Sequence, residues 1–121
     1  AQCQLTARSI AKKMGIPREK YTVCYQSRLG RDPWIQPYTS QVLKSLAQQG
    51  KKRILVFSPA FVADCLETIF EIGTEYQEEY EEMGGEHVQL VPSLNDHPRW
   101  IAALKDLATA PLEEIGSLAN V

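Results

Sequence analysis

The sequence has few of the features that mark secreted, membrane-spanning or disulfide-stabilised proteins. Its three cysteines, Cys3, Cys24 and Cys65, are an odd number without a CxxC pair, which argues against a disulfide framework and a four-thiolate metal site. No run approaches the roughly 20 apolar residues of a transmembrane helix. The first ten residues lack the basic-then-apolar layout of a signal peptide. We therefore expect a soluble, cytoplasmic chain.

Lys and Arg are missing from residues 64–86, which hold nine acidic residues. Residues 1–53 show the reverse, with eleven Lys or Arg against two acids. The formal net charge of −2 conceals this segregation. The basic residues are scattered, without a cluster or an RNA-binding motif, so we expect no nucleic-acid partner.

The length and composition fit one globular domain over residues 1–121. The chain is 44% hydrophobic and 23% charged. A chain of this size buries roughly two-thirds of its unfolded surface, so it needs no metal or disulfide to build a core.

Three short runs rich in β-branched, aromatic and aliphatic residues predict strands at 21–26, 53–58 and 87–91. Helical patterns lie around and between them, over 5–14, from Pro37 to Gly50, over about 64–83 and over about 97–108. Strands about 30 residues apart with intervening helices predict an α/β fold, a three-layer αβα sandwich with a parallel sheet. The first helix has no strand before it, so we expect a fragment that lacks the first strand of its unit.

The loops that follow the predicted strands are the places where chemistry is expected, because ligands bind beyond the carboxyl ends of parallel strands. Loops 26–34, 59–67 and 92–98 carry arginines, aromatics, a thiol, carboxylates and an imidazole. For any one loop the simpler interpretation is a solvated turn. Trp34 and Phe61 favour a packed site instead, because large aromatics in turns usually pack against something.

The acidic helix predicted over 64–83 has two faces. A core stripe is predicted from its apolar spacing at Leu66, Ile69, Phe70, Gly73, Tyr76, Tyr80 and Met83. The opposite face carries Glu67, Glu71, Glu75, Glu78 and Glu82. Like charges at i and i+4 cost about 0.2–0.5 kcal/mol per pair. An ordinary solvated face explains Glu78, Glu79, Glu81 and Glu82, whereas the row that starts in the crevice, Glu67, Glu71 and Glu75, suits passage of protons or a divalent cation.

The thiol and imidazole groups are open to two interpretations. Cys65 is either a small buried residue or a soft metal ligand, and its acidic neighbours Asp64 and Glu67 disfavour a nucleophilic thiolate. His87 and His97 have no ligand partner at metal-site spacing, which favours structural roles.

Together, these segments resemble the C-terminal half of ferrochelatases over about residues 21–108. Gln26-Ser27-Arg28-Leu29-Gly30, followed by Pro33-Trp34 and Pro37-Tyr38-Thr39, resembles the family's QS(R/K)xG…W…P.T segment, which lines the porphyrin pocket. Residues 61–76, FVADCLETIFEIGTEY, resemble the signature F.S(D/E)HIETLxELDxEY. Ser93-Leu94-Asn95 with His97-Pro98 resembles the downstream SLN segment.

The resemblance implies insertion of Fe²⁺ into protoporphyrin IX or coproporphyrin. It implies that Glu67 accepts pyrrole protons and that Glu71 and Glu75 continue an acidic path, with catalysis at Glu67 and Glu71. Asp64 matches a pocket position, and most of the family has histidine where this chain has Cys65. The implied metal route is Cys65, Glu67, Glu71 and Glu75, and the implied porphyrin contacts are Gln26, Ser27, Arg28, Leu29, Gly30, Trp34 and Phe61.

Several expectations about partners follow from the resemblance. Fe²⁺ is a substrate and no permanently bound cofactor is expected. Arg28 and Arg31 are candidates to pair with porphyrin propionates. The implied partner is an N-terminal domain of the same enzyme, so we expect the chain alone to be inactive and prone to self-association through its cleft face, and the full enzyme to associate peripherally with a membrane.

Two other interpretations stay open. One is a short stand-alone chelatase that dimerises to rebuild the cleft. The other is a non-catalytic module whose acidic helix binds a basic protein partner, which salt-sensitive binding without porphyrin binding would favour.

Overall fold

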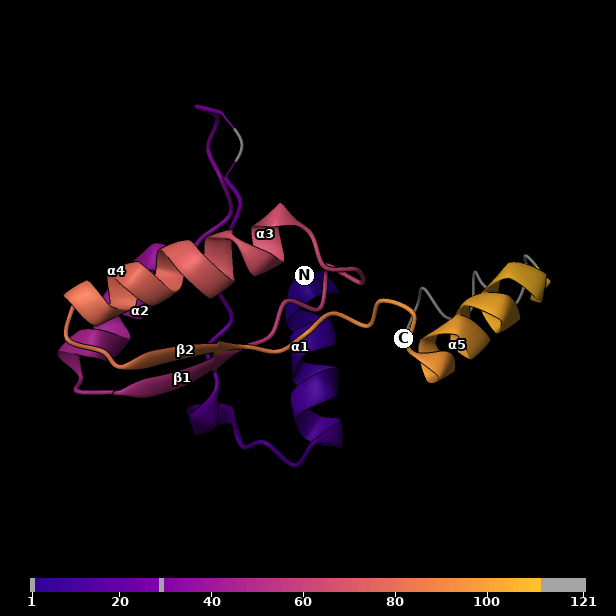
Figure 1. Cartoon of the computed structure of the whole chain (residues 1–121). Coiled ribbons are helices and arrows are strands. Elements are labelled where there is room, and N and C mark those ends of the chain that lie inside the picture. Colours follow the sequence, from indigo (N-terminus) through magenta and orange to yellow (C-terminus); the bar gives the residue numbers. More distant parts are fainter. Residues whose placement is uncertain (1, 29, 112–121) are drawn as a thin grey trace.

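The structure, a computed structural model, describes residues 2–28 and 30–111 (Figure 1). Its elements alternate between helix and strand after an initial helix. In chain order they are α1 (Gln2–Lys13), a 3₁₀ turn (Arg18–Lys20), α2 (Thr39–Gln48), β1 (Arg53–Val56), α3 (Leu66–Ile69), a π-helix (Glu71–Glu75), α4 (Tyr76–Glu82), β2 (His87–Leu90) and α5 (Pro98–Thr109).

The two strands form a parallel sheet. Arg53 pairs with His87 and Val56 with Leu90, and the chain crosses from β1 to β2 through α3, the π-helix and α4. This is a βαβ unit, in which the crossover helices cover one face of the sheet. The predicted α/β class, with a parallel sheet flanked by helices, is confirmed (Figure 1).

The strand predicted over 21–26 is wrong. Tyr25 makes only an isolated bridge, donating its N–H to the Pro37 carbonyl (2.9 Å) and accepting from the Thr39 N–H (2.9 Å). The backbone then turns into the left-handed region at Ser27, with φ of +58°. Both backbone groups of Tyr25 are hydrogen-bonded to residues at and just before the start of α2, so they are not available to pair with β1.

The core lies between the sheet and the helices α2 and α4. Its buried members are Leu43, Ile72, Tyr80 and Val88. The hydroxyl of Tyr80 is satisfied there because it donates to the Lys51 carbonyl at 2.7 Å. Gly85 makes this packing possible, since a Cβ at that position would lie 2.2 Å from the Tyr80 ring.

The predicted core stripe of the acidic helix is correct only at its C-terminal end. Tyr80 is fully buried, whereas Leu66 is 77% exposed and Ile69 is 59% exposed. The π-helix explains the difference, because the Glu75 N–H reaches back five residues to the Phe70 carbonyl (3.0 Å). The additional residue shifts the helical phase by about 100°, so Ile72 faces the core and Leu66 does not.

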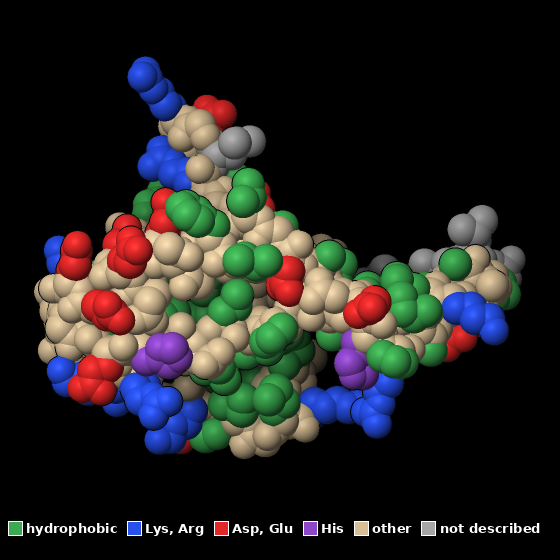
Figure 2. Space-filling view, viewed as in Figure 1, with side chains coloured by type: hydrophobic (Ala, Val, Ile, Leu, Met, Phe, Trp, Pro, Cys, Tyr) green, Lys and Arg blue, Asp and Glu red, His purple; other side chains and the backbone are tan. Residues whose placement is uncertain are grey.

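The opposite face of the sheet and the last helix carry exposed apolar side chains. Leu55 on β1 is 67% exposed, and Phe57 just beyond it is also exposed. Figure 2 shows uncovered hydrophobic side chains at the centre of the molecule, below the level of α4. The α5 helix projects away from the other elements (Figure 1), and its apolar Ile101, Leu104 and Leu107 are exposed.

Among the residues that the structure describes, no helix combines the length and the apolar character needed to cross a membrane.

Candidate active site

The loop after the Tyr25 bridge and the start of the acidic helix enclose an open hollow of about 450 Å³. Its lining residues are Ser27, Arg28, Leu66, Glu67, Phe70, Glu71 and Glu75. The structure therefore brings together the two segments that the sequence singled out, and it aligns the three glutamates of the predicted row along one wall. Leu66 and Phe70, predicted as core, give this wall an apolar surface.

Glu71 is held by hydrogen bonds from three residues. One carboxylate oxygen, Oε1, accepts from the Ser27 N–H (3.0 Å) and the Tyr76 hydroxyl (3.0 Å). The other oxygen accepts from the Ser27 hydroxyl (2.7 Å) and the Gln26 amide (3.3 Å). Glu71 therefore ties the loop to the π-helix, and its orientation is fixed.

Tyr76 is a partner of Glu71 that sequence reasoning placed only in the core stripe. Burial raises the pKa of Tyr76 well above its ordinary value, and the hydrogen bond and negative charge of Glu71 raise it further. Tyr76 therefore stays a neutral donor to the carboxylate. A tyrosine five residues after a glutamate was the available signal, but a regular α-helix would not align positions i and i+5.

Gln26 and Trp34, both predicted to contact porphyrin, have protein partners that build the loop. The Gln26 amide donates to the Glu67 carbonyl (2.6 Å) and accepts from the Ser58 hydroxyl (3.0 Å). The Trp34 indole N–H donates to the Gln26 carbonyl (3.1 Å). Gln26 thus links the end of β1, the first turn of α3 and the loop that carries Trp34.

Glu67 lies in the hollow with an exposed side chain. A hydrogen bond from the Cys65 side chain lowers the pKa of Glu67, and a hydrogen bond from its own backbone lowers it further. The carboxylate is therefore ionised at neutral pH and available as a proton acceptor or an oxygen ligand.

Cys65 is half-buried at the N-cap of α3. Its N–H donates to the Thr68 hydroxyl (2.9 Å), and that hydroxyl donates to the Cys65 carbonyl (3.0 Å). These contacts start the helix, because they satisfy groups at its first turn. Within residues 2–28 and 30–111, no three His, Cys, Asp or Glu side chains are grouped closely enough to hold a metal ion between them.

Of the other predicted residues that the structure describes, Arg28 lines the hollow, whereas Gly30, Arg31 and Phe61 do not. The guanidinium of Arg28 lies 5.9 Å from the Tyr38 ring centroid and donates to the Arg31 carbonyl (3.2 Å). Arg31 and Gly30 are exposed, and Leu29 lies outside the described residues. Phe61 is half-buried, and its N–H closes a turn on the Ser58 carbonyl (3.0 Å).

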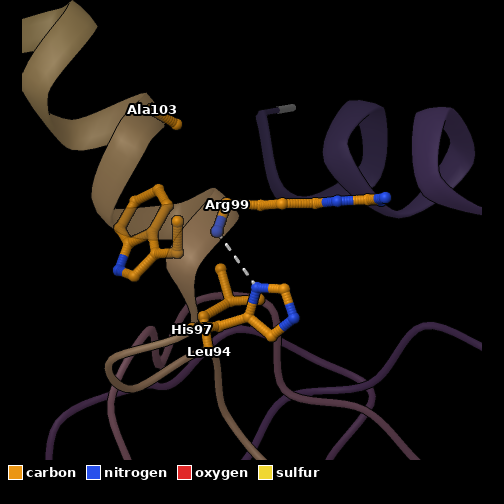
Figure 3. A pocket seen from close by; sticks show the side chains of 5 residues that line it. Leu94, His97, Arg99 and Ala103 are labelled. Carbon is orange, nitrogen blue, oxygen red and sulfur yellow. Dashed lines mark hydrogen bonds between the residues drawn. The ribbon is translucent and has the colours of Figure 1, made fainter.

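A second hollow of about 320 Å³ lies at the start of α5. Figure 3 shows Leu94 and His97 at its base and Ala103 above them on the helix. The His97 ring accepts the N–H of Arg99 (3.3 Å), which caps α5, and Pro98 follows at the first helical position. This geometry supports the structural role predicted for His97.

The acids at the C-terminal end of the helix are exposed, as predicted. Glu78, Glu79, Glu81 and Glu82 all face solvent. Figure 2 shows acidic side chains gathered over α4, and none of these four residues lines the hollow. Their exposure fits the solvated face expected from the sequence.

Comparison with known proteins identifies the family of this chain. A model of the ferrochelatase family matches residues 1–112. A ferrochelatase of Pseudomonas putida F1 is 55% identical over 106 residues, which are 88% of this chain and 31% of that protein. A ferrochelatase of Ectopseudomonas mendocina is 56% identical over 107 residues, 88% of this chain and 32% of that protein. The chain thus spans about a third of the length of the curated relatives it matches, and it belongs to the ferrochelatase family.

Proposed function

We propose that this chain supplies one wall of the crevice in which a ferrochelatase inserts Fe²⁺ into a porphyrin, with Glu67 as the acceptor of pyrrole protons. The observation that carries the proposal is the alignment of Glu67, Glu71 and Glu75 along the hollow, opposite Ser27 and Arg28. An ionised carboxylate beside an exposed apolar surface suits a flat macrocycle that must lose protons.

The proposed chemistry is a proton-for-metal exchange. Two pyrrole N–H bonds break as the porphyrin nitrogens bind Fe²⁺, and two protons must leave the ring. Glu67 is the proposed first acceptor because its side chain is exposed in the hollow and its carboxylate is ionised at neutral pH. Leu66 and Phe70 offer the apolar surface on which the ring can bind and bend toward its metallated shape.

The proposed route for protons and metal follows the same wall. Glu75 lines the same hollow and continues the proposed path. Cys65 does not line the hollow, but it lies two residues before Glu67 and is the soft ligand at which the proposed route begins. Glu71 lies between Glu67 and Glu75 in the sequence but already accepts four hydrogen bonds. Its proposed part in catalysis therefore includes holding the Gln26–Ser27 loop against the helix.

The porphyrin periphery is the proposed partner of the loop. Arg28 lines the hollow and carries a charge that matches a propionate, and its guanidinium donates to the carbonyl of Arg31, a second exposed arginine. Ser27, Leu29, Gly30, Trp34 and Phe61 remain proposed contacts, by the resemblance of the segment. Propionate pairing predicts that loss of the Arg28 charge raises KM for porphyrin more than it lowers kcat.

The remainder of a ferrochelatase is the proposed partner of the open face. The relatives are about three times as long as the matched segment, and Leu55, Phe57 and the apolar side of α5 are exposed. These surfaces are suited to contact with an N-terminal domain, and without it they favour self-association. The chain alone is accordingly proposed to lack metallation activity.

A chimera tests the proposed role of Glu67. Residues 1–112 of this chain would replace the matching third of the Pseudomonas putida F1 ferrochelatase, and porphyrin metallation by Fe²⁺ or Zn²⁺ would be followed by absorbance. Glu67→Gln is expected to lower kcat by about 10²- to 10⁴-fold, because it removes the general base. Glu78→Gln, an exposed acid on α4, is the matched control and should leave kcat unchanged.

The outcomes separate the candidate functions. Full activity of the Glu67→Gln chimera would refute the role of Glu67. Metallation by the 121-residue chain alone would instead support a stand-alone chelatase. Salt-sensitive binding of a basic protein by the chain, without porphyrin binding, would support the protein-binding module.

A further inference from the structure

We infer that Asp64 and Asn95 are a positioning pair, which fixes the first turn of α3 and thereby the carboxylate of Glu67. The inference rests on the proposed function for the importance of Glu67. The two residues bond reciprocally. The Asp64 N–H donates to the Asn95 side-chain oxygen (2.9 Å), and the Asn95 amide donates to the Asp64 carboxylate (2.8 Å). We call these two residues the Asp64–Asn95 pair.

The pair joins the loops that follow the two strands. Asp64 lies in the loop after β1 and Asn95 in the loop after β2. The Asp64 carboxylate also accepts the Ser93 N–H (3.0 Å), and the Asn95 N–H donates to the Val62 carbonyl (2.9 Å). Four hydrogen bonds therefore hold the two loops in one arrangement. This gives the Ser93-Leu94-Asn95 segment a role that its sequence alone did not explain.

Asn95 is suited to this position by its backbone. Its φ is +47°, in the left-handed region that asparagine enters more readily than most residues. The conformation directs the Asn95 N–H to Val62 while the side chain reaches Asp64. A residue with a branched or longer side chain would meet both requirements poorly.

The contacts continue from the pair into the helix that carries Glu67. Asp64 precedes Cys65, the N-cap of α3, and the Thr68 hydroxyl lies 3.4 Å from the Asp64 carboxylate. Thr68 is 1% exposed and bonds both the N–H and the carbonyl of Cys65. Glu67 is one of the three residues between Asp64 and Thr68, and it directly precedes Thr68. Its backbone position is thus defined by the pair on one side and by buried Thr68 on the other.

The helix depends on outside support because it is short. α3 spans only Leu66–Ile69 before the π-helix begins, so few intrahelical hydrogen bonds hold it. The apolar Leu66 and Ile69 are exposed, which leaves Thr68 as its buried anchor. Loss of the pair is therefore expected to move the first turn, and a shift of about 1 Å at a reacting group costs about 100-fold in rate.

Asp64 acts through Glu67 rather than on the substrate. The hollow is lined by Glu67, Glu71 and Glu75, whereas the Asp64 carboxylate is directed to Asn95 and Ser93. Hydrogen bonds from Asn95 and Ser93 lower the pKa of Asp64, so the acceptor stays ionised near neutral pH. Because Asp64 does not line the hollow and its carboxylate is bonded to Asn95 and Ser93, it is a positioning residue and not a proton acceptor.

An exchange of the two residues tests the pair. Asp64→Asn and Asn95→Ala each remove bonds between the loops. The double variant Asp64→Asn with Asn95→Asp restores both reciprocal bonds and the bond from the Ser93 N–H. It puts a carboxylate oxygen in place of the amide that donates to the Ser93 carbonyl at 3.3 Å, so recovery is expected to be incomplete. In the chimera, each single variant is expected to lower kcat by about 10- to 100-fold with little change in KM. The exchange should recover most of that loss. Asp96→Ala, at an exposed neighbour, is the control.

Hydrogen exchange provides a readout that does not depend on activity. The Thr68 and Ile69 amides both bond to the Cys65 carbonyl, at 3.1 and 2.9 Å. In the 121-residue chain, Asn95→Ala is expected to speed hydrogen exchange at these amides about tenfold or more. The double variant should restore their protection. If a single variant does not fold, the double variant tests the inference, because restoring the reciprocal hydrogen bonds should restore both folding and activity.

Three results would overturn the inference. The first is an unchanged kcat in the single variants, and the second is unchanged amide protection at Thr68 and Ile69 in Asn95→Ala. The third is a double variant that folds but recovers neither kcat nor amide protection. The proposed function fails separately, through full activity of Glu67→Gln in the same chimera. In that case the hydrogen-exchange result still reports whether the pair holds the helix.

Discussion

The two faces of the β1–β2 sheet differ in how completely this chain covers them. On one face Val88 is 4% exposed and packs with Leu43, Ile72 and Tyr80. On the other face Leu55 is 67% exposed. Within β1, Ile54 and Val56 pack against this core, whereas Leu55 between them belongs to an open apolar surface. The difference teaches that the stability of this segment comes from its helix-covered side, whereas its open side leaves apolar side chains exposed.

The largest expected effect comes from truncating the packed side. Ile72→Ala should lower the free energy of unfolding by about 2–5 kcal/mol, because Ile72 is fully buried. Leu55→Ala on the open side is the matched control, with an expected loss below about 0.5 kcal/mol. Urea unfolding of the chain measures both. Equal losses at the two positions would show that the open face is covered in solution.

A smaller loss is expected from overfilling the packed side. Gly85→Ala places a methyl group 2.2 Å from the Tyr80 ring, so the ring or the turn must move, at a cost of about 1–3 kcal/mol. Gly73→Ala is the control, since its nearest neighbour would lie at 3.8 Å. Thermal unfolding should show a lower Tm for Gly85→Ala and little change for Gly73→Ala. A similar Tm for the two variants would contradict the tight packing of Tyr80.

The secondary-structure elements differ in how well the sequence predicts them. The helices α1, α2 and α5 and the strands β1 and β2 follow from apolar spacing and Gly or Pro signals. The π-helix did not follow, because periodicity analysis assumes one helical repeat throughout, and the buried positions of residues 66–72 were therefore assigned wrongly. The strand over 21–26 failed because a strand needs a partner, and Tyr25 bonds residues 37 and 39 instead.

The candidate site was predicted in its composition but not in its internal contacts. The sequence brought Ser27, Arg28 and the glutamate row to one edge, and the structure places them around one hollow. That Gln26 and Glu71 bond to the protein depends on side-chain geometry and on the left-handed Ser27 backbone. Pattern and spacing contain no information on which polar groups are already satisfied.

At the boundary between the packed side and the hollow, Tyr76→Phe should have a moderate effect. It removes the hydroxyl that donates to Glu71 at 3.0 Å but keeps the ring in the core. The expected loss in the free energy of unfolding is about 1 kcal/mol. Urea unfolding measures it, with Tyr38→Phe as the control at a half-buried tyrosine. A loss as large as that of Ile72→Ala would mean that the ring itself had moved.

The smallest expected effect is a pH dependence of Asp64. Its pKa is lowered in the folded chain by hydrogen bonds from Asn95 and Ser93. The stabilisation is therefore fully present above the unfolded pKa, about 3.9, and is lost as the pH falls through the lower folded pKa. Tm measured between about pH 2 and 6 should fall more steeply for the unmodified chain than for Asp64→Asn. Parallel curves would show that these bonds do not favour the ionised carboxylate.

The π-helix has a consequence for how the length of this segment can vary. Because the Glu75 N–H bonds the Phe70 carbonyl, this turn contains one residue more than a regular turn. Deleting a single residue here would leave a continuous α-helix and no chain break. Leu66 and Glu67 would keep their orientation relative to Tyr80, because the extra residue and the wider turn that accommodates it would disappear together. A one-residue gap at this point of an alignment is therefore compatible with an unchanged wall of the hollow, whereas a one-residue gap elsewhere in the helix would rotate that wall by about 100°.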